Sequence, residues 1–178
     1  NDMDINSVIT QIGNTPLVRL KQASELTSCN IYGKAEYFNP GESVKDRAAL
    51  FIVQDALKRK LISKGGTIVE GTAGNTGIGL AVVCKEYDLK LKIVIPKTQS
   101  IEKKETLKKL GAELIEVDAV PYANPKNYIK QSKQIAEDLN KSNQNGVYWA
   151  NQFDNTVNTE AHVKTTAEEI WSQTAGAV

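Results

Sequence analysis

The chain has 178 residues, of which 40% are hydrophobic and 24% charged, a composition typical of a globular protein with one sizeable core. Its 22 Lys and Arg residues nearly balance its 21 Asp and Glu residues, so the charge pattern argues against nucleic acid and membrane as partners. Two cysteines and one histidine argue against a disulfide framework and a histidine-rich metal site. We therefore expect no metal, and a cytoplasmic location is the default because no apolar run is long enough to span a membrane.

Strand-like and helix-like segments alternate along the chain from residue 30 onward. Each strand-like run is short, and each is followed by a run with helical character. In chain order we predict strands at 30–37, 67–70, 91–95, 114–117 and 147–150, which alternate with helices at 44–61, 76–86, 101–110, 128–139 and 156–171. Repeated strand–helix units of this spacing predict an α/β fold with an open, twisted parallel sheet that carries helices on both faces.

Two loops of the predicted sheet stand out, at 39–43 and at 71–77, because ligands bind where a strand ends and a loop leads into the next helix. The second loop has a glycine at every third position, and Thr72, Asn75 and Thr76 add hydrogen-bonding side chains to it. Since the following helix begins with unpaired N–H groups, this loop is predicted to bind an anion. The alternative is a tight turn whose glycines serve packing. The spacing fits neither a P-loop nor the G-x-G-x-x-G pattern.

Lys45 lies in the first turn of the helix predicted at 44–61. The helix dipole disfavours a positive charge at that end, which favours the free amine. A free amine is the form that makes a Schiff base with an aldehyde cofactor. The alternative is a surface lysine paired with its neighbour Asp46.

Gln152 follows the strand predicted at 147–150, so it also lies at the carboxyl end of a strand. Its amide is suited to hold a substrate carboxylate. The alternative is that it caps the next helix, and the residue alone does not decide between the two.

Six segments of the chain resemble, in order, motifs of the cysteine synthase family, also called O-acetylserine sulfhydrylase, whose members are fold-type II enzymes that depend on pyridoxal phosphate (PLP). The segments are 12–18 (IGNTPLV), 39–47 (NPGESVKDR), 71–77 (GTAGNTG), 100–103 (SIEK), 152–153 (QF) and 169–171 (EIW). The resemblance runs from about residue 9 to residue 171. Their common order and spacing make the set specific, although each motif alone is ambiguous.

The resemblance implies that the chain is the N-terminal half of such an enzyme, with a truncated tryptophan synthase β-like fold. Residues 38–155 are then expected to form a small mobile α/β domain. Residues 1–37 would be an arm that contributes to a larger domain, and residues 156–178 would begin that domain. The family's Gly-rich phosphate loop and the serine that faces the pyridine nitrogen would lie beyond Val178.

By the same resemblance, Lys45 would bind pyridoxal 5′-phosphate covalently and act as the base at the substrate α-carbon, and Asn75 would hydrogen-bond the ring oxygen of the cofactor. The substrate carboxylate would be bound by Thr72, Gly74, Asn75, Thr76 and Gln152. The implied reaction is the β-replacement of O-acetyl-L-serine with sulfide, which gives L-cysteine and acetate. The family also implies a homodimer, with serine acetyltransferase as a further candidate partner.

The chain departs from the family at Ala73, where the loop usually carries a serine. The missing hydroxyl leaves two related enzymes open as alternatives, a cysteine desulfhydrase and a cystathionine β-synthase-like enzyme, and some members described as cysteine-degrading share the alanine. A catalytically inert chain that keeps the fold to bind a partner is the alternative from another class. Lys45 argues against it, because an inert relative has no need of a lysine at a helix start.

Overall fold

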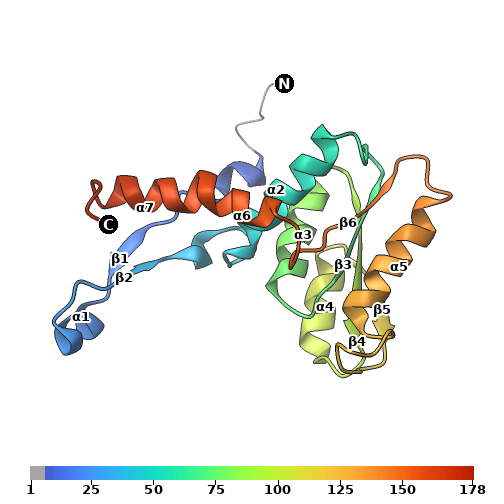
Figure 1. Cartoon of the computed structure of the whole chain (residues 1–178), viewed down its shortest axis with the longest axis horizontal. Helices are drawn as coiled ribbons and strands as arrows, with labels where there is room; N and C mark the ends of the chain where they lie inside the picture. Colours follow the sequence, from blue (N-terminus) through green and yellow to red (C-terminus); the bar gives the residue numbers. More distant parts are fainter. Residues whose placement is uncertain (1–6) are drawn as a thin grey trace.

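The computed structural model describes residues 7–178 and contains a four-stranded parallel sheet (Figure 1). Its strands are β3 (Thr67–Gly71), β4 (Lys90–Pro96), β5 (Glu113–Val117) and β6 (Val147–Trp149), in the order β5-β4-β3-β6. Helices α2 (Lys45–Lys58), α3 (Asn75–Glu86) and α4 (Ile101–Lys109) cover one face, and α5 (Tyr128–Asn140) covers the other. The predicted fold class, a parallel sheet with helices on both faces, is confirmed.

The two faces of the sheet have separate apolar cores because successive strand residues point to opposite sides. Ile68 of β3 and Ile93 of β4 belong to the larger core beneath α2 and α3. Their chain neighbours Val69 and Val94 point the other way and pack against α5. Both central strands are therefore buried on both faces, and β4 accordingly ends in a continuous apolar run at 93–96.

The N-terminal segment forms an arm outside this sheet (Figure 1). It contains η1 (Val8–Gln11), β1 (Leu17–Arg19), α1 (Lys21–Thr27), β2 (Tyr32–Lys34) and η2 (Glu36–Phe38). The strand predicted at 30–37 is wrong in extent and in the parallel pairing that the repeated units implied: β2 pairs antiparallel with β1. The connection, which includes α1, returns the chain beside β1, where the Leu20 N–H donates to the Ile31 carbonyl at 2.8 Å and extends the antiparallel ladder.

The C-terminal segment is a helical run in three parts, α6 (Val157–Ala161), η3 (His162–Thr166) and α7 (Ala167–Gln173). The single helix predicted at 156–171 is therefore interrupted, since η3 is a π-helical turn. The Thr165 hydroxyl donates a hydrogen bond to the Ala161 carbonyl at 2.6 Å in this turn, and His162 Nδ1 lies 2.8 Å from the Thr166 hydroxyl. Such turns are frequent at functional sites.

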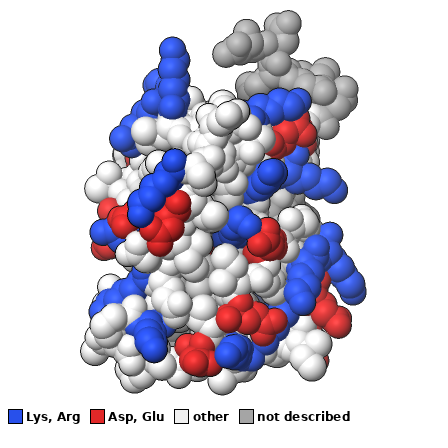
Figure 2. Space-filling view, turned by 90° about the vertical axis from the view of Figure 1, so that its right-hand side faces the viewer, with Lys and Arg blue, Asp and Glu red and all other residues white. Residues whose placement is uncertain are grey.

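Charged side chains of both signs are mixed on the face shown in Figure 2. Lysines near α4 illustrate the pattern, since Lys104 pairs with Glu116 at 2.6 Å and Lys97 with Asp118 at 2.8 Å. Within residues 7–178, no helix combines the length and the hydropathy needed to cross a membrane. The same residues contain no group of three or more His, Cys, Asp or Glu side chains arranged to hold a metal ion.

Candidate active site

The loops that follow β3 and β6 meet at one edge of the sheet because these two strands are hydrogen-bonded neighbours. The Thr76 hydroxyl, in the first turn of α3, donates a hydrogen bond to the side-chain oxygen of Gln152, 76 residues further along the chain. Both residues are buried, at 3% and 8% exposure. The structure therefore joins the two regions in which the sequence predicted carboxylate-binding residues.

The glycines in the loop after β3 differ in how much space surrounds them. A Cβ atom at Gly71 would lie 2.8 Å from the backbone of Tyr128 and Ile129, so only glycine lets β3 end this close to α5. A Cβ atom at Gly77 would lie 3.1 Å from the side chain of Leu107, a tight contact, whereas a Cβ atom at Gly74 would meet no atom within 4 Å. The packing interpretation thus holds for Gly71 and Gly77, and Gly74 is the position that is open to a ligand.

The first turn of α3 offers hydrogen-bond donors at this open position. Gly74 and Asn75 are exposed. The Gly77 N–H donates to the Gly74 carbonyl at 3.1 Å, whereas the N–H groups of Asn75 and Thr76 lie too early in the helix to have a carbonyl partner within it. Thr72 is buried, and its hydroxyl accepts a hydrogen bond from the Gly74 N–H at 3.2 Å. Thr72 therefore shapes the loop with its oxygen and retains a proton for donation.

Lys45 is the first residue of α2, as predicted, and is half-buried. Its backbone packs against α3 at Gly79, where a Cβ atom would lie 3.1 Å from the Lys45 carbonyl carbon and from the Asp46 nitrogen. Gly79 is about one helical turn beyond Asn75. Packing of α2 on α3 therefore brings the backbone of Lys45 to within about one turn of the loop after β3.

Asp46 does not pair with Lys45, contrary to the alternative interpretation of that lysine. No ion pair joins the two among the residues that the structure describes. Instead Asp46 is fully buried, and its Oδ2 accepts a hydrogen bond from the Gly41 N–H while Oδ1 has no hydrogen-bond partner. Burial, together with the charge of Glu36, raises the pKa of the Asp46 carboxyl despite the Gly41 bond.

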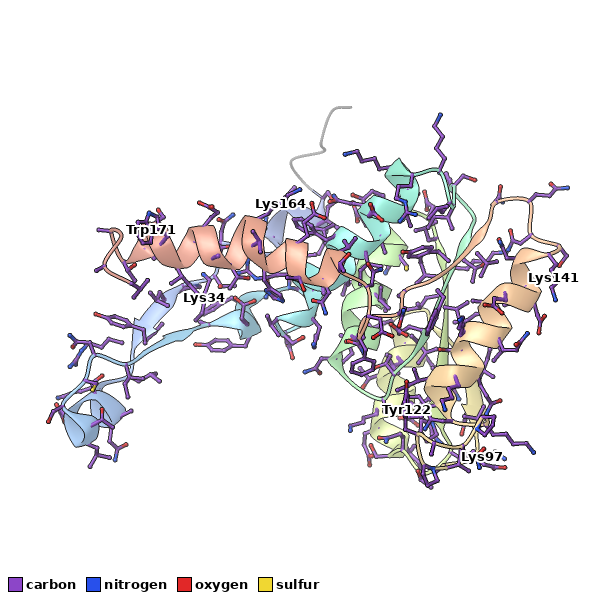
Figure 3. All side chains as sticks on the ribbon, viewed as in Figure 1. Lys34, Lys97, Tyr122, Lys141, Lys164 and Trp171 are labelled. Carbon is purple, nitrogen blue, oxygen red and sulfur yellow. The ribbon has the colours of Figure 1, made fainter. Side chains whose placement is uncertain are left out.

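Arg47, two residues after Lys45, forms a buried ionic network that sequence reasoning missed. Only 1% of its side chain is exposed. Its guanidinium donates to Glu36 at 2.8 and 2.9 Å and to both carboxylate oxygens of Glu169, one of them at 2.9 Å. Lys34, which Figure 3 labels on β2 beside α7, adds a second cation 2.8 Å from Glu169. The network ties the arm, α2 and α7 together.

The network also binds neutral side chains of the predicted motifs. The Thr15 hydroxyl donates to Glu36 at 2.6 Å, and Asn39 Nδ2 donates to Glu36 at 2.8 Å. Although burial raises the pKa of Glu169, the hydrogen bonds from Arg47 and Lys34 hold it at about 2, so this carboxylate is charged at neutral pH. The two cations and two carboxylates alternate in space, so each buried charge has a partner of opposite sign that offsets the cost of its desolvation.

Glu70, at the end of β3, is a second residue that sequence reasoning missed. It is 1% exposed, and its carboxylate accepts hydrogen bonds from the backbone N–H groups of Gly71 at 2.9 Å and of Gln152 at 3.0 Å. Burial raises its pKa to about 7, an effect that the two N–H groups only partly offset. The available sequence signal was a charged residue directly after the apolar pair Ile68 and Val69 in a predicted strand.

A cavity of about 180 Å³ lies between the loop after β3 and the first turns of α4. Ala73 and Asn75 line it from the loop, and Glu102, Lys103 and Thr106 line it from α4. Ala73, the position at which the chain departs from the family, therefore lines a cavity beside the predicted substrate loop.

Residues 8–178 match the family model of the pyridoxal-phosphate dependent enzymes. The chain belongs to this family. PLP is the cofactor of its members, as the resemblance implied.

Among the relatives, cysteine synthase 1 of Emericella nidulans is 54% identical over 172 residues, which cover 97% of this chain and 45% of the relative. Cysteine synthase 1 of Neurospora crassa is 56% identical over 167 residues, which cover 94% of this chain and 43% of the relative. The resemblance to cysteine synthases is thereby confirmed. The chain spans about half the length of these curated relatives and corresponds to their N-terminal part.

Solved structures show the same fold. A hydrogen sulfide-producing enzyme from Fusobacterium nucleatum is 40% identical with a TM-score of 0.79, and the match covers 98% of this chain and 54% of that one. O-ureido-L-serine synthase is 37% identical with a TM-score of 0.84, and the match covers 97% of this chain and 52% of that one. Both likenesses support the fold-type II assignment.

Proposed function

We propose that this chain is the N-terminal part of a cysteine synthase, which replaces the acetoxy group of O-acetyl-L-serine with sulfide to give L-cysteine and acetate. The observation that carries the proposal is the convergence of three segments on α3. The backbone of Lys45 packs against α3 at Gly79, and the Gln152 side chain accepts a hydrogen bond from Thr76 in the first turn of α3. The loop at 71–77 leads directly into the same helix. The names of the relatives point to the same chemistry.

The side chains at this edge fit the aldehyde and ring of pyridoxal phosphate. Lys45 supplies an amine at a helix start, and Asn75 supplies an exposed amide donor beside an open glycine. We assign Lys45 to the covalent link and Asn75 to the ring oxygen. Pyridoxal phosphate, when bound, supplies the electron sink that makes the substrate α-proton acidic.

The substrate carboxylate is assigned to the start of α3. Anions are stabilised there by backbone N–H groups and by the positive end of the helix dipole. The residues that we assign to it are Thr72, Gly74, Asn75, Thr76 and Gln152. With the carboxylate held, Lys45 Nζ takes the proton from the α-carbon, and the acetate leaves the β-carbon with its bonding electrons. Hydrosulfide then adds to the β-carbon, and Lys45 Nζ returns the proton to the α-carbon.

A second candidate is a PLP enzyme that breaks cysteine down and releases sulfide. Ala73 favours this candidate, because a methyl group faces the cavity beside the loop where a hydroxyl is usual in the family. One solved relative is described as producing hydrogen sulfide. A cystathionine β-synthase-like activity would differ from cysteine synthase in its nucleophile, which is a thiol in place of sulfide.

The division into domains is also a proposal. Residues 38–155 would form a small mobile domain, while residues 1–37 and 156–178 would belong to a larger one. The support is that β1, β2 and α7 lie outside the parallel sheet (Figure 1). We further propose a homodimer, with serine acetyltransferase as a candidate partner.

Product analysis on the full-length protein tests the function. With PLP, O-acetyl-L-serine and sulfide, we expect one cysteine and one acetate per turnover. With cysteine alone, the second candidate predicts sulfide release at a comparable or faster rate. If neither cysteine nor sulfide exceeds the blank without protein, both candidates are excluded, and a cystathionine β-synthase-like enzyme and an inert chain remain.

A further inference from the structure

Glu70 bridges the two loops of the candidate site. It is the fourth of five residues of β3, and one of its carboxylate oxygens accepts from the N–H of Gly71, where the loop after β3 begins. The other oxygen accepts from the N–H of Gln152, in the loop after β6. A single buried side chain thus sets the separation between the starts of two loops that are 82 residues apart in sequence.

The bridge continues to the start of α3. Gln152 is held by its backbone to Glu70 and by its side chain to the hydroxyl of Thr76. From Thr76 the chain returns through the loop to Gly71 and Glu70. These residues form a closed circuit of covalent and hydrogen bonds, so a shift of the Glu70 carboxylate would move Gln152 relative to the N-terminus of α3.

Packing alone gives no reason for a carboxylate at this position. Ile68, two residues earlier on the same face of β3, fills the larger core with an apolar side chain. A buried carboxylate is costly in comparison, and its raised pKa reflects that cost. Unlike an apolar side chain, however, the Glu70 carboxylate can accept hydrogen bonds from the N–H groups of two different loops.

We propose that Glu70 is a positioning residue that holds the loops after β3 and β6 in the arrangement that binds the substrate carboxylate. The inference rests on the proposed function, because it takes these loops to be the carboxylate site. Glu70 itself contacts neither substrate nor cofactor in this proposal. Its effect is therefore on recognition of the carboxylate and not on the amine, which is assigned to Lys45.

The test compares two ligands on the full-length enzyme loaded with PLP. One is L-serine, and the other is ethanolamine, which has the same amine and hydroxyl but no carboxylate. The affinity of each is measured by titration of the cofactor absorbance. The substitution Glu70→Gln keeps the side-chain volume but sets an NH₂ group against one of the two N–H donors. We expect the dissociation constant of L-serine to rise at least fivefold and that of ethanolamine to change less than twofold. Glu105→Gln, an exposed carboxylate on α4, is the control and should change neither.

Each other outcome contradicts a different claim. Equal weakening of both ligands, or no weakening of L-serine, would overturn the positioning role. An unmodified enzyme whose absorbance does not respond to L-serine would overturn the proposed function instead. If Glu70→Gln fails to fold, Glu70→Asp, which keeps the charge but shortens the reach, is measured in the same way. Failure of both variants to fold would make Glu70 a stability residue and end the proposal.

Discussion

The ionic network around Arg47 and the loop site at the start of α3 are both polar, but they use their polar groups in opposite ways. In the network, donors and acceptors satisfy one another: Arg47 donates to Glu36, Glu169, Thr15 and Thr165 and is 1% exposed. In the loop site, Gly74 and Asn75 are exposed and begin a helix, so donors remain for a ligand.

The segment 39–47 contributes to both regions, which shows how one short motif serves two purposes. Asn39 and Arg47 point into the network, while Lys45, between them, begins the helix that packs on α3 at Gly79. The difference teaches that the network fixes the backbone of this segment, so that the one lysine assigned to chemistry is presented from a rigid support. Four predictions test this division, from the largest expected effect to the smallest.

Lys45→Ala should remove catalysis without removing the fold. We expect the loss of covalently held PLP and at least a thousandfold lower rate of cysteine formation, since general base and covalent catalysis both depend on this amine. The free energy of unfolding should change by less than about 1 kcal/mol, because the side chain belongs to neither core nor network. Lys58→Ala, at the exposed end of the same helix, is the control for both measurements. A Lys45→Ala enzyme with near-normal turnover would show that the wrong lysine has been assigned.

Arg47→Met should lower the free energy of unfolding, in contrast to Lys45→Ala. It leaves the carboxylates of Glu36 and Glu169 buried without their shared cation, a change expected to cost about 3–5 kcal/mol in urea unfolding. Adding Glu36→Gln should recover part of the loss, because Arg47 is the cation that pairs with Glu36, whereas Glu169 keeps Lys34 as its partner. Arg59→Met removes an exposed partner of Asp55 and should cost less than about 1 kcal/mol. Equal losses for the two arginine variants would mean that the network contributes no special stability.

The two regions should also respond to pH with opposite signs. The folded pKa of Glu169 is about 2, below its ordinary value of 4.5, so its stabilising contribution is present above pH 4.5 and is lost as the pH falls toward 2. The folded pKa of Glu70 is about 7, so the folded state keeps a proton that the unfolded state has lost, and stability falls as the pH rises from 4.5 to 7. The second effect is on the order of 3 kcal/mol at most. Urea unfolding of Glu70→Gln and Glu169→Gln across pH 2–8 measures each slope, and an unchanged decline in Glu70→Gln would contradict the assignment.

Ala73→Ser should have the smallest effect. We expect it to change the ratio of cysteine synthesis to cysteine breakdown, and not to raise or lower both rates equally. It returns a hydroxyl to the wall of the cavity beside the loop, so we expect the ratio of cysteine synthesis to cysteine breakdown to change by about threefold to tenfold, or roughly 1 kcal/mol. Ala123→Ser, in an exposed turn, serves as the matched control. If the two variants give the same ratio, position 73 has no part in selecting the reaction.

Local patterns were sufficient to predict most of the elements that surround the site. The strands at 67–70, 91–95, 114–117 and 147–150 and the helices between them were placed within a few residues, because β-branched runs, glycine loops and prolines act over short distances. The errors lie at 30–37 and 156–171, where an antiparallel turn-back and a π-helical turn depend on contacts that a sequence window does not contain.

The roles of single charged residues were harder to predict than the elements. A role could be proposed for Lys45 from the sequence because its position at a helix start and its family motif are local. Arg47 was overlooked because its partners, at positions 36 and 169, are far apart in the sequence and meet only in the folded chain. Glu70 was overlooked for the same reason, since its partner Gln152 belongs to another strand.

What the sequence by itself determined is the alternation of strands and helices, the family motifs and the lysine at a helix start, since each depends on neighbouring residues and on period. Only the tertiary structure decided which glycine is open, which carboxylates are buried and which loops meet. Those properties arise from desolvation and from hydrogen bonds between distant segments, and both exist only once the chain is packed.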